Sequence, residues 1–90
     1  MMGAIPEIDA RGLLCPLPVL RLRKMLDAAP AGARFRLIAT DPAAMIDVPH
    51  FCATAGHSLI ATQNLADGAH VFTVERGLAA PHPRMDKPEP

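Results

Sequence analysis

The sequence predicts an α/β fold: a two-layer α/β sandwich in the order βαβαββ, with a four-stranded mixed sheet and both helices on one face. Segments of alternating apolar residues and segments with apolar residues at helical spacing follow one another along the 90 residues. A helix between the first two strands favours a parallel pair with a right-handed crossover, and an Asp-Gly turn between the last two favours an antiparallel hairpin. Because two helices are too few to cover both faces of four strands, we expect the opposite face to be partly open to solvent or to a partner.

The N-terminal third contains a strand and a helix. Residues 4–10 predict a short strand, in which Pro6 favours an edge position or a start at Glu7. Gly12 gives the backbone the freedom to leave this strand. The chain is then expected to be helical to about residue 29, because proline is tolerated in the first turn of a helix. One apolar stripe marks the buried face of this helix: Val19, Leu22, Leu26 and Ala29.

The middle of the chain predicts a strand followed by two helical pieces. Residues 34–40 alternate apolar and polar side chains, which is typical of a strand. Asp41-Pro42 is a helix start signal, and Asp47-Val48-Pro49 repeats it. We therefore expect a helical turn at 42–46 and a separate helix at 48–55. The remaining segments are two strands and the hairpin loop between them, at 57–64, 70–76 and 65–68.

Composition limits the domain organisation and the location. Nine basic residues balance nine acidic ones, so direct nucleic-acid binding and attachment to a membrane surface are not expected. Residues 5–77 are predicted to form one domain, and the proline-rich residues 78–90 a disordered tail. No apolar run is long enough to span a membrane, and the N-terminus does not resemble a secretory signal. These features predict a cytoplasmic protein.

Two cysteines and four histidines are the candidates for thiol and metal chemistry. Cys15 and Cys52 are expected to be free thiols, because disulfides are rare in the cytosol. The histidines do not fall at metal-ligand spacings, so no metal site is expected.

The segment 9–18, Asp-Ala-Arg-Gly-Leu-Leu-Cys-Pro-Leu-Pro, places Cys15 where a strand exit meets a helix start. Backbone N–H groups and the helix dipole at such a position favour an anion, which predicts a lowered pKa and a reactive thiolate. Residues 11–36 contain six basic residues and one acidic residue, and a positive field would act in the same direction. Pro16 and Pro18 are expected to stiffen the backbone and hold the sulfur at the surface.

This segment resembles the signature of the TusA-like (SirA-like) sulfur carriers, and Asp41-Pro42-Ala43 with residues 47–52 resembles their second-helix region. The resemblance covers about residues 7–76 and implies the two-layer βαβαββ fold. It also implies that Cys15 carries sulfur as a persulfide. The supporting motif residues are Arg11, Gly12, Pro16 and Pro18, and the candidates for partner docking are Leu17, Arg21 and Arg23.

The resemblance also implies what the carrier works with. The donor is expected to be a cysteine desulfurase or a rhodanese-type protein, and a downstream protein accepts the sulfur. No metal, nucleotide or organic cofactor is expected. Cys52 is interpreted as a packed structural thiol, and Asp41 and Asp47 as helix caps.

Three other functions stay open. A non-catalytic interaction or regulatory module of the same fold predicts that Cys15→Ser leaves function intact. An RNA-binding domain, by fold analogy with the third bacterial initiation factor, predicts an affinity that falls steeply with salt. A peroxide-type thiol sensor requires a disulfide between Cys15 and Cys52 under mild oxidation.

Overall fold

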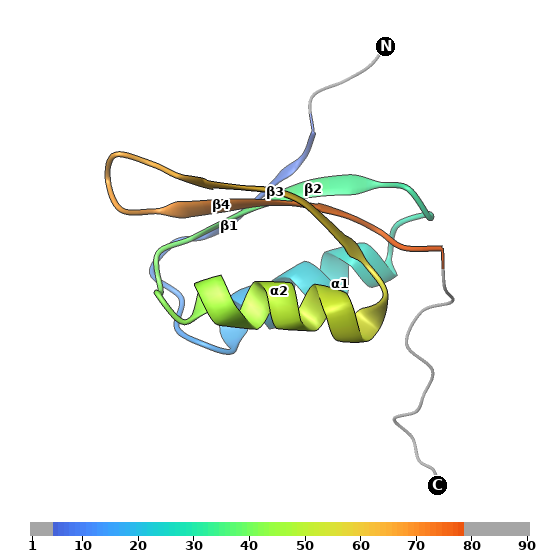
Figure 1. Cartoon of the computed structure of the whole chain (residues 1–90), viewed down its shortest axis with the longest axis horizontal. Coiled ribbons are helices and arrows are strands. Elements are labelled where there is room, and N and C mark those ends of the chain that lie inside the picture. The colour runs from blue at the N-terminus through green and yellow to red at the C-terminus, as the bar shows by residue number, and fades with distance from the viewer. Residues whose placement is uncertain (1–4, 79–90) are drawn as a thin grey trace, which may run out of the picture.

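The computed structural model describes residues 5–78 and confirms the predicted fold class. The elements follow the order βαβαββ, and both helices lie on the same side of one sheet (Figure 1). Their bounds are β1 Glu7–Ala10, α1 Leu17–Asp27, β2 Arg34–Ala39, α2 Ala44–Ala55, β3 Ser58–Asn64 and β4 His70–Glu75.

The sheet has the strand order β1-β2-β4-β3. β1 pairs with β2 in parallel, with Ile8 opposite Leu37, as expected for strands joined through a helix. β4 pairs antiparallel with both β2 and β3, and the β3–β4 ladder shifts its register between Leu59 and Ala61. The hairpin therefore inserts its second strand at the centre of the sheet, and β1 and β3 form the edges.

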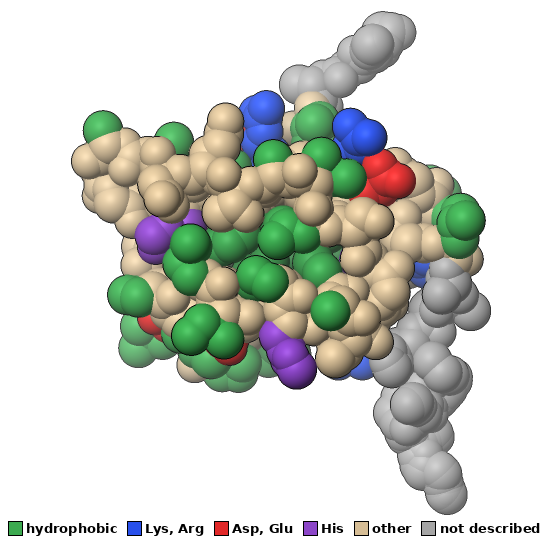
Figure 2. All heavy atoms as spheres, in the orientation of Figure 1, with side chains coloured by type: hydrophobic (Ala, Val, Ile, Leu, Met, Phe, Trp, Pro, Cys, Tyr) green, Lys and Arg blue, Asp and Glu red, His purple; other side chains and the backbone are tan. Residues whose placement is uncertain are grey.

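The core lies between the sheet and the two helices, where apolar side chains gather between β3 and α2 in Figure 2. The predicted stripe of α1 faces this core: Leu22 and Leu26 are fully buried, and Val19 and Ala29 pack against the cluster. Phe72 of β4 and Val48 of α2 are also fully buried. Burial of this apolar surface holds the helices on the sheet.

The opposite face of the sheet has no helix over it (Figure 1). It presents two ion pairs, Arg34 Nε to Glu75 Oε1 at 2.9 Å and Arg36 to Glu7 at 3.8 Å. A small apolar cluster also lies outside the main core, formed by Ile38, Ala69 and Val71.

The predicted break in the second helix is wrong. α2 is one continuous helix from Ala44 to Ala55 with Pro49 inside it, rather than a turn at 42–46 followed by a helix at 48–55. A proline here removes one backbone donor. Ala44, Val48 and Cys52, spaced four residues apart, form one buried face across that point. Packing of this face on the sheet outweighs the missing hydrogen bond.

Part of the expected architecture lies outside the described residues. Only Leu78 of the predicted tail at 78–90 is described, so the domain limits 5–77 stay a prediction. Within residues 5–78, neither helix has the length and apolar character needed to cross a membrane.

Candidate functional site

Cys15 lies in the loop that leads from β1 into α1. Its side chain is exposed and its thiol is free. Pro16 is the N-terminal flanking residue of α1, and the Cys15–Pro16 peptide bond is cis. The amide of Leu17 donates to the carbonyl of Leu14 at 2.8 Å, which closes a tight turn around the cysteine. The backbone therefore presents the sulfur at the surface immediately before the helix.

The loop is anchored to the segment that follows β2. The amide of Gly12 donates to Thr40 Oγ1 at 2.9 Å, and the amide of Cys15 donates to Asp41 Oδ2 at 2.7 Å. Asp41 also accepts from the amide of Ala43 through Oδ1, at 3.0 Å. These backbone hydrogen bonds lower the pKa of Asp41, and the bond from the Cys15 amide has the largest effect. Asp41 thus fixes the cysteine loop as well as the start of α2.

Gly12 has φ of 78°, a left-handed conformation. Residues with a Cβ rarely adopt this conformation, which explains why the motif has a glycine at position 12.

The Cys15 thiol donates a hydrogen bond to Asp47 Oδ2, with Sγ and the oxygen 2.6 Å apart. This bond is the first cause of a raised pKa of Cys15, followed by desolvation from neighbouring atoms and by the charges of Asp47 and Asp41. The predicted lowering of this pKa is therefore wrong for the free protein. The hydrogen bond with Asp47 and the negative charges of Asp47 and Asp41 favour the protonated thiol, which is opposite to the effect expected from a helix N-terminus.

The basic residues of the segment 11–36 do not gather at the sulfur. Arg34 and Arg36 pair with carboxylates on the open face of the sheet, and Arg23 lies 3.9 Å from Asp27 along α1. The positive charge is therefore distributed over different surfaces, and no basic group is among the causes that shift the pKa of Cys15.

Cys15 and Asp47 border a shallow groove of about 300 Å³ between the start of α1 and α2. The other lining residues are Pro16, Val19, His50, Phe51 and Thr54. Exposed apolar residues flank the hydrogen-bonded pair in sequence: Leu14 is 69% exposed, Leu17 49% and Ile46 74%. An apolar surface around an accessible thiol is suited to contact with another protein.

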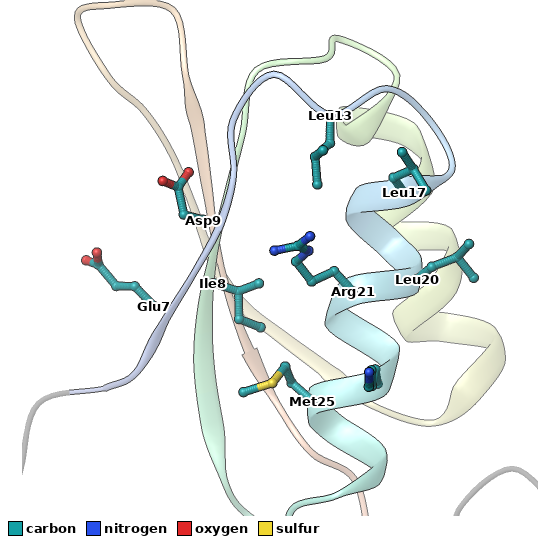
Figure 3. Close-up of a pocket in the computed structure, with 9 residues that line it drawn as sticks. Glu7, Ile8, Asp9, Leu13, Leu17, Leu20, Arg21 and Met25 are labelled. Atoms are coloured by element: carbon teal, nitrogen blue, oxygen red, sulfur yellow. The ribbon is translucent and has the colours of Figure 1, made fainter.

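The remaining predicted site residues lie in different surroundings. Leu17 and Arg21 line a second groove, between β1 and α1 (Figure 3). Arg23 is not among the residues that line it. Pro18 is buried in the first turn of α1, so its side chain supports the helix rather than contacting a partner. The exposed Arg11 donates its amide to Asp9 Oδ1 at 3.1 Å.

Cys52 is 2% exposed and belongs to the core cluster, which confirms that it is a packed thiol. Burial raises the pKa of Cys52 to about 11. A buried, protonated thiol is poorly suited to resolve a disulfide, so this placement argues against the thiol-sensor function. Within residues 5–78, no three His, Cys, Asp or Glu side chains are grouped closely enough to hold a metal ion.

The sequence interpretation missed the roles of Thr40, Asp41 and Asp47 at the cysteine. The sequence predicts that both aspartates are helix caps, yet Asp47 lies inside α2 and accepts a hydrogen bond from the thiol. The sequence did contain a signal for Thr40 and Asp41. Because β1 and β2 are parallel neighbours, the segments that leave their carboxyl ends must meet, and they contain Cys15 and Thr40-Asp41.

Comparisons with known proteins agree with one another. The family model described as Sulfurtransferase TusA matches residues 6–76. A protein of Pseudomonas syringae pv. syringae named Sulfur carrier protein TusA is 47% identical over 70 residues, which are 78% of this chain and 82% of the relative. A protein of the same name from Pseudomonas entomophila is 39% identical over 69 residues, 77% of this chain and 85% of the relative.

Among solved structures, a SirA-like protein from Desulfitobacterium hafniense superposes with a TM-score of 0.71 at 24% identity. The superposition covers 79% of this chain and 96% of that one, which supports the fold.

Proposed function

This chain belongs to the TusA sulfurtransferase family, and from that premise we propose that it is a sulfur carrier that accepts sulfane sulfur as a persulfide on Cys15 and passes it to an acceptor protein. The observation that carries the proposal is the contrast between the two thiols. Cys15 is exposed on an anchored loop with apolar residues around it, whereas Cys52 is packed in the core. A carrier needs one accessible sulfur and no competing thiol beside it.

The proposed loading step is a thiol–persulfide exchange without net oxidation. The Cys15 sulfur attacks the terminal sulfur of a donor Cys–S–SH group. A new S–S bond forms on Cys15 while the donor's S–S bond breaks, and the donor cysteine leaves as a thiolate. Cys15 loses one proton and the leaving thiolate takes one up, so charge and atoms balance. The products are a Cys15 persulfide and a reduced donor cysteine.

Asp47 is the group placed to handle that proton, because its Oδ2 already accepts the hydrogen bond from the Cys15 thiol. In the free protein the pair keeps the sulfur protonated, which slows reaction with oxidants and with unrelated disulfides. In the complex with a donor, Asp47 takes the proton as Cys15 attacks. Asp41 holds the cysteine backbone still during the exchange through its bond to the Cys15 amide.

The proposed carrier works with two partner proteins in the cytoplasm. A cysteine desulfurase or a rhodanese-type protein supplies the sulfur in the cytoplasm, and an acceptor protein removes it. The sulfur would serve tRNA thiolation, cofactor assembly or sulfur oxidation. The exchange needs no resident metal or organic cofactor on this chain, because each partner brings its own reacting sulfur.

The test is the intact mass of the protein after incubation with a cysteine desulfurase and L-cysteine, measured without reductant. Wild type and Cys52→Ser are expected to gain about 32 Da, one sulfur atom, which reductant removes. Cys15→Ser is the matched variant and is expected to gain nothing. A wild-type protein that gains no sulfur from this donor, nor from a rhodanese with thiosulfate, would refute the proposal and favour a non-catalytic interaction module.

A further inference from the structure

The groove beside Cys15 has room for a further atom on the thiol. Its volume is about 300 Å³, and Cys15 is one of its lining residues. A water molecule takes up about 30 Å³ in the liquid, so the groove is large enough for a sulfur atom and for part of an approaching molecule. A persulfide lengthens the Cys15 side chain by that one sulfur atom. The outer sulfur of the loaded protein therefore has space within the groove.

The walls of this groove suit a sulfur atom. Its apolar lining residues are Pro16 and Val19 at the start of α1 and Phe51 of α2. Sulfur is polarisable and makes favourable contacts with apolar and aromatic side chains. Apolar walls also lower the local dielectric constant, which strengthens the attraction between an ionised sulfur and a positive charge in the same groove.

Three polar side chains line the groove besides Cys15, and two of them have partners already. Asp47 Oδ2 accepts the hydrogen bond from the Cys15 thiol at 2.6 Å. Thr54 Oγ1 donates to the backbone carbonyl of His50 at 3.0 Å. The ring of His50 has no hydrogen-bond or ion-pair partner among residues 5–78. The imidazole is therefore the polar group that is available to a new atom on Cys15.

Asp47 and His50 lie next to each other on one side of α2, because they are three residues apart in a helix. The carboxylate of Asp47 contacts the inner sulfur, Cys15 Sγ, and its negative charge repels an ionised outer sulfur. An imidazole takes up a proton near neutral pH and then attracts an anion. Together the two side chains favour a persulfide whose outer sulfur turns away from Asp47 and toward His50.

The other charged groups near the groove leave this role to His50. Asp41, in the loop after β2, bonds the Cys15 amide and adds negative charge near the inner sulfur. On α1, Arg23 Nε lies 3.9 Å from Asp27 Oδ2. Among the described residues that line the groove, His50 is the one that can become a cation.

We propose that this groove holds the outer sulfur of the Cys15 persulfide and that His50 pairs with that sulfur through a ring nitrogen. The inference rests on the proposed function and names the residue that keeps the sulfur in place between loading and delivery. The pairing is a proton transfer without oxidation or reduction. The outer S–H gives its proton to the imidazole, which leaves a sulfur anion beside an imidazolium.

The experiment measures how fast iodoacetamide alkylates the outer sulfur of wild type and of His50→Gln, each loaded with a cysteine desulfurase and L-cysteine. Intact mass distinguishes the alkylated persulfide from the alkylated thiol by one sulfur atom, about 32 Da. At pH 6, His50→Gln is expected to react roughly threefold more slowly, the effect of an exposed ion pair, because less of its outer sulfur is ionised. At pH 9 the two rates are expected to be equal, since the outer sulfur is ionised in both proteins.

Three controls assign the effect to the charge of His50. His50→Lys keeps a cation at this exposed position and is expected to react at pH 6 at least as fast as wild type. His70→Gln is the same change on β4, where the ring is bonded to Asn64 at 2.9 Å, and is expected to keep the wild-type rate. The unloaded Cys15 thiol is expected to react equally fast in wild type and His50→Gln, because no basic group is among the causes that shift its pKa.

The outcomes distinguish the holding role from the carrier function. A wild-type rate for loaded His50→Gln at pH 6 overturns the inference and leaves the carrier function standing. An equal loss in His70→Gln, an equal loss at the unloaded thiol or a slow His50→Lys overturns it too.

If neither a cysteine desulfurase nor a rhodanese adds sulfur to wild type, the carrier function fails. Loading with inorganic polysulfide, which gives one sulfur atom to Cys15 and leaves as a shorter polysulfide, then still decides whether His50 holds the outer sulfur. If polysulfide adds no sulfur either, both proposals are overturned.

Discussion

Replacing Cys52 by alanine will remove a pH dependence of stability that the protein otherwise shows between pH 8 and pH 10. The thiol is 2% exposed, and burial raises its pKa from 9.0 to about 11. In the unfolded chain the thiol ionises near the ordinary value, whereas in the folded protein it stays protonated. A raised pKa of this kind contributes stability that is fully present below pH 9 and is lost as the pH rises toward 11.

The size of the effect follows from the two pKa values. Linkage gives a loss of about 1.3 kcal/mol in the free energy of unfolding between pH 8 and pH 10. Few other groups titrate in this window, because the chain has no tyrosine. The pKa of Cys15 is also raised and acts in the same direction, so the comparison is made in a Cys15→Ser background.

The assay is urea unfolding at pH 8 and at pH 10, with reductant, for Cys15→Ser and for the double variant Cys15→Ser with Cys52→Ala. The single variant is expected to lose about 1.3 kcal/mol more than the double variant over this range. Equal losses in the two proteins would refute the reasoning, since they would show that Cys52 ionises as readily in the folded protein as in the unfolded chain.

Three other predictions address the site and the fold. Asp47→Asn removes the negative charge of Asp47 and weakens its hydrogen bond with the thiol, which lowers the pKa of Cys15, so iodoacetamide will alkylate Cys15 several-fold faster at pH 8; an unchanged rate would contradict the geometry. Pro49→Ala restores a backbone donor inside α2 and is expected to stabilise the protein by about 1–3 kcal/mol, measured as a rise in Tm. Leu22→Ala is expected to cost about 2–5 kcal/mol in chemical unfolding, while Leu20→Ala, at a position 49% exposed, stays within about 0.5 kcal/mol; similar losses would argue against the assigned face of α1.

Local sequence pattern was sufficient for most of the fold. The stripe of Leu22 and Leu26 predicted which side of α1 is buried, and the alternation in residues 34–40 predicted the strand β2, whose core face consists of Phe35, Leu37 and Ala39. These predictions succeeded because the spacing of apolar residues in a helix or strand follows from backbone geometry alone. The strand–helix–strand order likewise implied the parallel pair of β1 and β2.

The second helix shows where local pattern was insufficient. Pro49 is a local signal for a break, and by itself it favours two helical pieces. The helix stays continuous across Pro49 because Ala44, Val48 and Cys52 form one face that is buried against the sheet. That burial depends on the assembled core, which local signals do not contain.

The sequence by itself determined that Cys15 lies at the start of the first helix and is followed by Pro16 and Pro18. It also determined that Cys52 belongs to an apolar helix face. Only the tertiary structure decided the chemistry of the Cys15 thiol. Folding brings Asp41 and Asp47 to Cys15 from 26 and 32 positions away along the chain, and they raise the pKa that the helix start alone would lower. The physical reason is that charge interactions depend on distance in space, whereas a sequence pattern specifies only neighbours along the chain.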